Sequence, residues 1–414
     1  MTSRRERGCR RRVGYTYHQT MGAGETGISE VSKYLSPKYL CLNSIAPYFA
    51  MFPPSFPLKV LSCDNRGRLT KSSPTWVLDP FCGRGTTNFA ARVLGYPSVG
   101  IDISPVAVAI ASAKLASSTE DEIVRSAERL IAAYAAEAHV PEGEFWEYAY
   151  HPKTLREICA IRQGLLESST DLKPSSGGAD DMVLLRAIML GALHGPRGKV
   201  TQNYLSNQMP RTYATKPAAA VRFWKKRNLT PPYVDTLAVI RRRARRVTQS
   251  LPPRTGGFVF QSDARSVRLK GFERSFGFII TSPPYYRMST YITDQWLRYW
   301  FLGGPPAPDY SLNKQLDMSS PDSYARELSR VWLNVASYAA PGCVLAVRLG
   351  SIPSAAVDAS AIAVESITST GGAWRILKVE NAENPSRTRR QAVQFRIGTS
   401  QPIQEIDVLA IFEG

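Results

Sequence analysis

The segment "TWVLDPFCGRGTTNFAARVLGYPSVGIDISPVAVAIASAKL", residues 75–115, constrains the fold more than any other part of the chain. A short β-type run, Trp76 to Leu78, meets a turn with two glycines, after which an amphipathic helix is expected from about Thr86. A second short strand, Ser98 to Ile101, ends on Asp102 and leads into another helix. Strand, turn, helix and strand in this order predict a unit of a parallel α/β sheet.

The alternation of strands and helices stops near residue 120 and resumes at residue 257. Between these positions the sequence is helical or irregular in pattern, with a Ser/Gly-rich break at 173–181. Further strands are expected at 257–267, 276–285, 342–352, 374–380, 392–398 and 406–412, and helices at 322–340 and 355–370. We therefore predict an α/β fold in which one Rossmann-like, doubly wound sheet is interrupted by a long, mainly helical insertion.

The chain is strongly basic, with a net charge of +18 and a pI near 9.7. Thirteen Lys and Arg residues lie between Pro196 and Ser250, where Asp235 is the only acid, and aromatic residues are interleaved with them. A cluster of one sign with aromatics favours phosphate contact and base stacking, whereas a solvated surface normally mixes both signs. The run "RRRARR" at 241–246, taken alone, is also compatible with an exposed helix end.

Cysteines and histidines give no sign of a metal centre. The six cysteines and four histidines are scattered, without the spacing of a zinc site or a disulfide framework, so a reducing cytoplasm is the expected setting. No window is apolar over the length of a membrane helix. The basic N-terminal "RRERGCRRR" is not followed by the apolar stretch of a secretory signal. We expect residues 1–32 to be a disordered basic arm. The alternative is that the start codon is assigned too early.

The peptide "DPFCGRGTT", residues 79–87, follows a predicted strand and opens a predicted helix. Gly83 and Gly85 allow a tight turn and a close approach of a ligand to the backbone. The helix N-terminus presents free amides to a carboxylate or another anion. The spacing is neither that of a Walker loop nor that of the dinucleotide fingerprint. Taken alone, the turn is equally consistent with a simple connection between strand and helix.

Acidic residues are expected at the ends of the next two strands. Asp102 closes the strand that starts at Ser98, and Asp263 closes the strand that starts at Gly257. Parallel strands end at the same edge of a sheet, where an acidic side chain can hold two ribose hydroxyls. Each acid alone is also a candidate helix N-cap. Together with the glycine turn, the two acids predict an adenosine-binding crevice.

The peptide "IITSPPYYRMSTY", residues 279–291, ends the fourth predicted strand. Its two prolines make the backbone stiff, so that its carbonyls point in fixed directions. An exocyclic amine of a nucleobase is a poor nucleophile, because its lone pair is delocalised into the ring. The Ser282 hydroxyl and the Pro283 carbonyl are suited to accept hydrogen bonds from both N–H groups and to free that pair. Tyr285 offers a flat face to a base taken out of the double helix.

The peptide "TSPPY", together with "DPFCGRGTT" and "GIDIS", resembles the S-adenosylmethionine-dependent amino-group DNA methyltransferases. The serine form resembles mainly the cytosine-N4 branch, whereas adenine-N6 members more often carry Asp or Asn at the position of Ser282. The resemblance extends from about Lys33 to the C-terminus, and the motif order resembles the α arrangement. It implies a methyltransferase catalytic domain formed by 33–119 and 257–414, with a DNA target-recognition region in the inserted residues 120–256.

The resemblance also implies the roles of individual residues. Phe81, Gly83 and Gly85 would line the methionine end of S-adenosyl-L-methionine. Asp102 would bind the ribose, and Asp263 the adenine amine. The full set of expected cofactor-binding residues is Asp79, Pro80, Phe81, Gly83, Gly85, Thr86, Thr87, Asp102, Ile103, Asp263, Ala264 and Thr281. The expected catalytic residues are Ser282, Pro283, Pro284 and Tyr285, and no metal is implied.

One further segment, at 45–54, resembles the family motif that closes over the amino-acid end of the cofactor. Many relatives have a basic residue before its Phe-Pro-Pro sequence, whereas this chain has Met51. The contact made by that side chain is therefore not expected here.

DNA contacts are expected from the basic part of the insertion and from the segment after the SPPY peptide. The expected nucleic-acid-binding residues are Arg211, Lys216, Arg222, Lys225, Lys226, Arg227 and Arg287. A helix is expected to begin near Asp294, which would be its N-cap. The apolar set that follows recurs at helical spacing and is expected in the core rather than as a stacking platform. Its members are Trp296, Leu297, Trp300 and Phe301.

These observations favour a site-specific cytosine-N4 DNA methyltransferase that acts on a flipped base of duplex DNA. Adenine-N6 methylation is the nearest alternative, an RNA base methyltransferase is a more distant one, and a DNA-binding module without turnover belongs to another class. Cys82 lies in the cofactor turn, so a cysteine nucleophile of the cytosine-C5 kind is not expected. A cognate restriction endonuclease is a partner that the resemblance admits, and no membrane association is expected.

Overall fold

The structure of the protein is a computed structural model that describes residues 35–37, 39–48, 52–62, 75–168, 179–195, 202–207, 216–287, 295–309, 316–351, 357–382 and 404–414. The N-terminal arm at 1–32, the expected strand at 392–398, Met51 and Arg211 lie outside these residues. No helix in the described part of the chain is long and apolar enough to cross a membrane.

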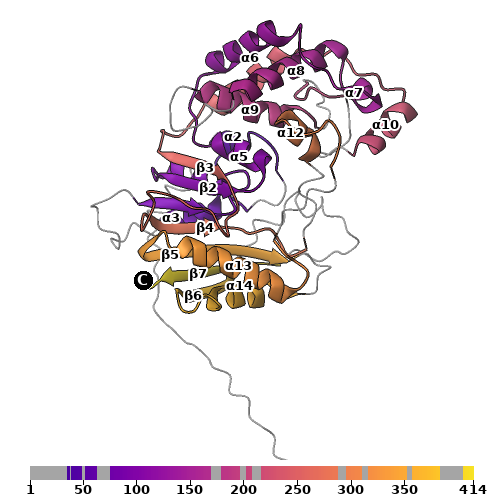
Figure 1. The fold of residues 1–414 in the computed structure, drawn as a ribbon. Helices are drawn as coiled ribbons and strands as arrows, with labels where there is room; N and C mark the ends of the chain where they lie inside the picture. Colours follow the sequence, from indigo (N-terminus) through magenta and orange to yellow (C-terminus); the bar gives the residue numbers. More distant parts are fainter. Residues whose placement is uncertain are drawn as a thin grey trace, which may run out of the picture.

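The strands of the described residues form a single seven-stranded sheet (Figure 1). Their bounds are β1 Trp76–Asp79, β2 Ser98–Asp102, β3 Gly257–Gln261, β4 Phe276–Thr281, β5 Ala339–Ser351, β6 Trp374–Asn381 and β7 Gln404–Phe412. The order across the sheet is β3-β2-β1-β4-β5-β7-β6. The strands from β3 to β5 in this order pair in parallel, while β7 is antiparallel to both of its neighbours. The predicted Rossmann-like, doubly wound α/β fold is confirmed.

The sheet has a topological switch point between β1 and β4. The chain proceeds outward from β1 through β2 to β3 and then returns to the other side of β1 as β4. In open α/β sheets, ligands bind outside the carboxyl ends of the strands at such a point. β4 is buried at all six positions, as expected of a central strand of a parallel sheet.

Helices cover both faces of the sheet (Figure 1). The helices on one face are α3 (Ser55–Ser62), α4 (Thr86–Val93) and α5 (Pro105–Ser112), and those on the other are α13 (Pro321–Ala336) and α14 (Ala359–Thr368). Successive residues of the central strands contribute to two hydrophobic cores. Val77 belongs to the core that contains Phe89 of α4, and Leu78 belongs to the core that contains Trp332 of α13.

The described part of residues 120–256 is helical and lies at the β3 end of the sheet (Figure 1). Its helices are α6 (Glu120–Tyr134), α7 (Glu144–Ala149), α8 (Pro152–Glu167), α9 (Asp180–Ala192), α10 (Pro217–Lys226) and α11 (Thr236–Thr248). α6 starts with a capping box of Thr119 and Glu122. α9 packs against α5, and α11 packs against α2 (Leu40–Asn43). The core of these helices is continuous with the core of the α4 and α5 face.

The short helix α12, Trp296–Phe301, follows the SPPY segment after a gap in the described residues. Its four large apolar side chains, at positions 296, 297, 300 and 301, are buried, as predicted. The N-cap residue is Gln295, without a side-chain capping bond, and the expected cap Asp294 lies outside the described residues.

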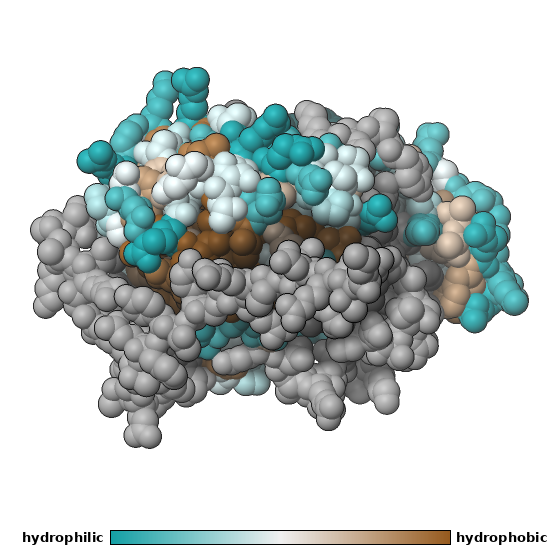
Figure 2. All heavy atoms as spheres, turned by 90° about the horizontal axis from the view of Figure 1, so that it is seen from below, coloured by the Kyte–Doolittle hydropathy of each residue, from teal (hydrophilic) through white to brown (hydrophobic). Residues whose placement is uncertain are grey.

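The edge strand β6 has a partly apolar surface. Leu377 and Val379 are 51% and 39% exposed. On the face seen from below Figure 1, hydrophobic side chains gather across the middle, with hydrophilic side chains above them (Figure 2). β5 and β7 stand between β4 and β6 in the sheet, so the edge at β6 is separate from the switch point.

Candidate cofactor and active site

The turn after β1 is shaped by two glycines and by the neighbouring helix α5. Gly83 and Gly85 have φ angles of 49° and 78°, in the left-handed region that favours glycine. A Cβ atom at Gly85 would lie 2.8 Å from the Cα atom of Ala111, so α5 leaves no room for a side chain. A Cβ atom at Gly83 would lie 3.6 Å from Cε1 of Tyr48, which places the Tyr48 ring beside the turn. The N-cap of α4, Gly85, makes no side-chain capping bond, so the first amides of α4 are left for a ligand or for solvent.

Asp102, the last residue of β2, fastens the same turn. Its Oδ2 atom accepts a hydrogen bond from the Gly83 amide at 2.9 Å, and its Oδ1 atom accepts one from the Ser104 amide at 2.8 Å. Burial raises the pKa of this carboxyl to about 6. Ser104, and not Asp102, is the N-cap of α5, which removes the helix-capping alternative for Asp102. A carboxylate has about four acceptor sites, so Asp102 retains capacity for ribose hydroxyls.

Asp79, the last residue of β1, joins the cofactor turn to the segment after β4. Its Oδ1 atom accepts hydrogen bonds from the Phe81 amide at 3.1 Å and from the Thr281 hydroxyl at 2.6 Å. The Thr87 hydroxyl donates to the Ile280 carbonyl at 3.1 Å, which adds a second link. Asp79 is fully buried, and burial raises its pKa to about 7. Among the described residues, no group hydrogen-bonds its Oδ2 atom.

The proline carbonyls of the SPPY segment have different surroundings. Ser282 follows β4 directly and is partly exposed, while Pro283 is buried. The hydroxyl of Tyr324, on α13, donates to the Pro284 carbonyl. Within the described part of the chain, no donor engages the Pro283 carbonyl. Of the two carbonyls, that of Pro283 is therefore the one left for a substrate amine.

Tyr285 is fixed by two strands that follow it in the sequence. Its hydroxyl donates to the carboxylate of Glu405 on β7. Its ring lies against Gly350 of β5, where a Cβ atom would come within 2.8 Å of the ring. The tyrosine is 6% exposed. Sequence reading missed Glu405, Gly350 and Tyr324 because no local pattern marks them, and only the order β4-β5-β7 and the packing of α13 bring them to the SPPY segment.

Asp263 is engaged by a neighbouring cation. β3 ends at Gln261, so the expected strand at 257–267 is too long, and Asp263 lies in the turn that follows β3 rather than at its end. Nε of Arg265 donates to both carboxylate oxygens of Asp263, at 3.0 and 3.1 Å, and Arg265 also pairs with Glu327. The Arg265 guanidinium holds the pKa of Asp263 below its usual range. Any adenine contact would share this carboxylate with Arg265.

The structure thus brings together one part of the expected cofactor set. The residues connected through the turn by these hydrogen bonds are Asp79, Phe81, Gly83, Thr87, Asp102 and Thr281. Pro80, Gly85 and Thr86 belong to the same turn, and Ile103 follows Asp102 with 39% of its surface exposed. Asp263 and Ala264 follow β3, which is the neighbour of β2 at the edge of the sheet. In the described residues they make no hydrogen bond to the turn.

Within the described part of the chain, one basic side chain of α10 forms an ion pair. Lys225 forms an ion pair with Glu144 of α7. The guanidinium of Arg227 lies over the Phe223 ring, 4.1 Å from its centroid. The expected DNA-binding residues of this region that are exposed are Lys216, Arg222, Lys225, Lys226 and Arg227. Arg287, after the SPPY segment, has a left-handed φ of 62° and lies over the Tyr286 ring at 5.5 Å.

The arginine run in the last turns of α11 is largely engaged within the protein. Arg245 donates to both carboxylate oxygens of Glu120 at 2.9 and 3.0 Å, and Arg241 lies 3.7 Å from the same carboxylate. Arg242 and Arg243 donate to backbone carbonyls of the segment 202–207. Because Glu120 and Glu144 lie outside the window from 196 to 250, a charge count over that window overstates the free positive charge.

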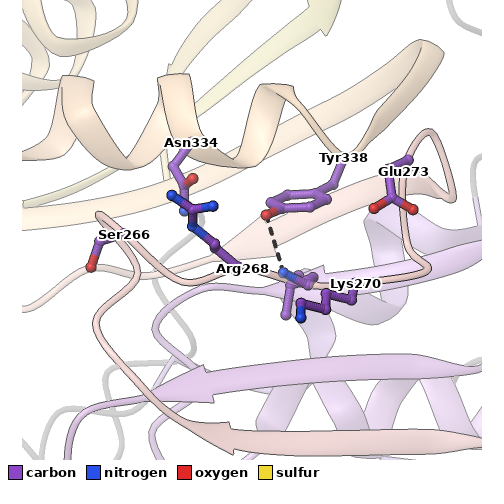
Figure 3. A pocket seen from close by; sticks show the side chains of 7 residues that line it. Ser266, Arg268, Lys270, Glu273, Asn334 and Tyr338 are labelled. Atoms are coloured by element: carbon purple, nitrogen blue, oxygen red, sulfur yellow. Dashed lines mark hydrogen bonds between the residues drawn. The ribbon is translucent and has the colours of Figure 1, made fainter.

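A cavity of about 540 Å³ lies away from these residues (Figure 3). It is lined by Ser266, Arg268, Leu269, Lys270, Glu273, Asn334 and Tyr338. These residues come from the connection between β3 and β4 and from the end of α13, close to the amino ends of β4 and β5. None of the expected site residues lines this cavity, so it is not the candidate site.

The residues of the turn fit S-adenosylmethionine. The amides at the start of α4 suit a carboxylate, Asp102 suits ribose hydroxyls, and Phe81 and Ile103 supply apolar surface beside them. Burial raises the pKa of the Cys82 thiol well above its usual value, which disfavours a thiolate there. Within the described residues, no group of three or more His, Cys, Asp or Glu side chains is placed to hold a metal ion.

The comparison with protein families bears on this same turn. A profile of the N6/N4 methyltransferase family, described as DNA methylase, matches residues 62–113, which contain β1, the glycine turn, α4, β2 and α5. The match supports a DNA methylase domain, and with it an enzyme. This family covers both the N6 and the N4 amino-group branches, as its name states.

Solved structures give weaker likenesses. The rRNA methyltransferase AviRa from Streptomyces viridochromogenes, at 1.5 Å, is 14% identical with a TM-score of 0.32, covering 88% of this chain and 87% of that one. A protein whose structure concerns the conversion of a disulfide bond into a thioacetal group during echinomycin biosynthesis is 11% identical with a TM-score of 0.29, covering 93% and 91%. At these TM-scores the likenesses carry no inference about this chain. A comparison with curated proteins gives no match.

Proposed function

We propose that the protein is a site-specific DNA methyltransferase that moves a methyl group from S-adenosylmethionine to the exocyclic N4 amine of a flipped cytosine in duplex DNA. The observation that carries the proposal is the pair of links from Asp79 to Thr281 and from Thr87 to the Ile280 carbonyl. These links hold the glycine turn and the SPPY segment together at the switch point. The family match over residues 62–113 supports amino-group DNA methylation, and it does not distinguish N4 from N6.

The SPPY segment supplies the acceptors for the substrate amine. S-adenosylmethionine, when bound, supplies an electrophilic methyl group. The Ser282 hydroxyl and the Pro283 carbonyl accept hydrogen bonds from the amine, which draws the nitrogen towards tetrahedral geometry and frees its lone pair for attack. Tyr324 occupies the Pro284 carbonyl and so fixes the peptide before the reaction. The proton released from the methylated amine passes to solvent.

The cofactor is held by the ends of β1 and β2. Asp102 binds the ribose hydroxyls, and the turn at Gly83 and Gly85 lies against the methionine end. Asp263 binds the adenine amine together with its partner Arg265, which restricts the directions in which its carboxylate can accept. These assignments are part of the proposal.

The insertion supplies the DNA contacts. We assign the target-recognition region to residues 120–256 and the catalytic domain to 33–119 and 257–414. The exposed basic side chains of α10 are the phosphate contacts in this assignment, since of these side chains only Lys225 forms an ion pair among the described residues. The SPPY segment with its serine favours cytosine as the substrate base.

Product analysis tests the proposal. Purified protein is incubated with mixed-sequence duplex DNA and labelled S-adenosylmethionine, and the DNA is digested to nucleosides for mass spectrometry. The expected product is N4-methylcytosine. Detection of N6-methyladenine would support the same mechanism with adenine as the substrate base. Methylation of RNA alone would show that the substrate is RNA and not DNA. DNA binding without S-adenosylmethionine binding or product would establish a binding module.

The variant Ser282→Ala separates chemistry from binding. We expect kcat to fall by about 10²- to 10³-fold, the usual cost of removing one preorganised hydrogen-bonding group. The affinities for S-adenosylmethionine and for DNA should remain those of the unmodified protein. Ser266→Ala, in the separate cavity, is the matched control and should leave all three quantities unchanged. Equal losses of binding and turnover in Ser282→Ala would contradict a catalytic role.

A further inference from the structure

An arginine stands inside the glycine turn, at position 84 between Gly83 and Gly85. Its Nε atom donates to the Thr86 hydroxyl at 3.4 Å. Among the described residues, no carboxylate lies within ion-pair distance of its guanidinium. The two acids at the neighbouring strand ends, Asp79 and Asp102, are bonded to backbone amides and to Thr281 instead. A guanidinium has five N–H donors, so Arg84 retains most of its hydrogen-bonding capacity.

The surroundings of Arg84 make an unpaired charge costly. Burial lowers the pKa of the Arg84 guanidinium to about 10, and no neighbouring acid offsets this effect. Arg92, whose pKa burial also lowers to about 10, donates to the carbonyls of Lys114, Ala116, Pro252 and Pro253. A partly buried charge without such partners is stabilised when an opposite charge binds.

A second cation lies beside the turn and adds to the excess of positive charge. Lys114 is fully buried, and a Cβ atom at Gly85 would lie 2.9 Å from its Cγ atom. Its ammonium group donates to the carbonyls of Leu42 and Asn43 at 2.9 and 3.3 Å, which accounts for its place in the fold. Burial, and then the charge of Arg84, hold the pKa of Lys114 well below its usual value. Arg84 and Lys114 are therefore two neighbouring cations that form no ion pair among the described residues.

We propose that Arg84 binds the carboxylate at the amino-acid end of the methyl donor. The inference rests on the proposed function, and it adds a residue that the motif does not assign. Arg84 is partly exposed, so a ligand can reach it, and its planar group matches a carboxylate in two parallel hydrogen bonds. The free amides at the start of α4 stand beside it and favour the same anion.

A ligand pair tests this assignment by binding alone. Isothermal titration calorimetry compares S-adenosylmethionine with decarboxylated S-adenosylmethionine, which keeps the sulfonium and the adenosine but lacks the carboxylate. The unmodified protein should bind the complete molecule about 10- to 100-fold more tightly, as expected of charged hydrogen bonds in a partly buried site. Arg84→Gln should lose most of this preference while its affinity for the decarboxylated molecule stays the same.

Two further variants serve as references. Arg84→Lys keeps the charge without the planar group, and it should retain a reduced preference for the carboxylate. Arg268→Gln, an exposed residue of the separate cavity, is the matched control and should bind both molecules as the unmodified protein does. Should Arg84→Gln fail to fold, as judged by its thermal transition, the Arg84→Lys comparison alone decides the outcome.

The outcomes separate this inference from the proposed function. If the unmodified protein binds neither molecule, the proposed function fails. If Arg84→Gln, or Arg84→Lys in its place, keeps the full preference for the carboxylate, the assignment of Arg84 is overturned and the function stands. A loss of DNA affinity in Arg84→Gln with an unchanged preference between the two molecules would also overturn it, since the anion at Arg84 would then be a DNA phosphate.

Discussion

Charged residues have different partners in two regions of the molecule, the strand ends at the switch point and the basic surface of the insertion. At the strand ends, Asp79 and Asp102 bond to backbone amides and hydroxyls of neighbouring segments, and no cation pairs with them among the described residues. On the insertion, Arg245 and Lys225 pair with acids of α6 and α7. The first arrangement holds acids in a buried crevice by hydrogen bonds, whereas the second neutralises charge on a surface.

The comparison shows when sequence position predicts a site. Parallel strands end at one edge, so motifs at their ends become neighbours through the topology itself. A surface cluster has no such constraint, because its partners come from any part of the chain that packs nearby. Glu120 is more than a hundred residues before Arg245 in the chain, yet it accepts two hydrogen bonds from it. A charge count along the sequence cannot include such a partner.

The largest effect that we predict concerns the buried carboxyl of Asp79. Its pKa is 3.8 before burial and about 7 in the folded protein, so the folded state keeps a proton that the unfolded state has lost between these values. The free energy of unfolding should therefore fall as the pH rises from about 4 to 7, with a contribution of about 4 kcal/mol from this group. Asp79→Asn should remove that part of the pH dependence. Urea unfolding at a series of pH values measures it.

Asp79→Asn would also place an unpartnered amide where Oδ2 now lies, which lowers stability at every pH. The informative quantity is therefore the slope of the free energy of unfolding against pH. Asp263→Asn provides a control of opposite sign. Arg265 lowers the pKa of Asp263, so its stabilising contribution is present at neutral pH and is lost as the pH falls through the acid range. An unchanged slope between pH 4 and 7 in Asp79→Asn would show that this carboxyl is ionised in the folded protein at low pH.

The second prediction concerns the orientation of Tyr285. Glu405→Gln weakens the hydrogen bond that holds its ring, and we expect kcat to fall about tenfold with little change in the affinity for S-adenosylmethionine. Tyr285→Phe should have a similar effect, and the double variant should lose no more than either single one. Single-turnover kinetics with calorimetry separate the two quantities. Glu413→Gln, in the exposed pair with Arg375, is the control, and additive losses would show independent roles.

Most of the fold was predictable because the strands have strong local signals. The expected strands at 76–78, 98–101, 374–380 and 406–412 agree with β1, β2, β6 and β7 to within two residues. β3 is shorter than expected, because the chain turns after Gln261 and the Asp263 carbonyl accepts the Ser266 amide. The limit of a strand at such a turn depends on hydrogen bonds that the apolar pattern does not encode.

The site was predictable only where its residues belong to a motif. The turn at 79–87 and the SPPY segment were identified from their own sequences, and the sheet order places them side by side. Tyr324, Gly350 and Glu405 have no motif, and each reaches the SPPY segment through packing between distant elements. Arg84 is in the motif, but its importance depends on the absence of an ion pair to it among the described residues, which only the structure shows.

The smallest predicted effect distinguishes paired from unpaired lysines on α10. Lys226 is exposed, whereas Lys225 pairs with Glu144, so the two neighbours should differ in their contribution to DNA binding. Lys226→Gln should reduce the slope of log affinity against log salt by about 0.9, the value for one phosphate contact. Lys225→Gln should reduce it by less, because the ion pair with Glu144 keeps Lys225 from a full phosphate contact. Fluorescence anisotropy with labelled duplex DNA at several salt concentrations measures both slopes.

Glu144→Gln completes the comparison, since it releases Lys225 and should make the slope steeper. Equal changes for the two lysines would show that the ion pair opens when DNA binds, and the internal pairing of the basic surface would then not limit its affinity.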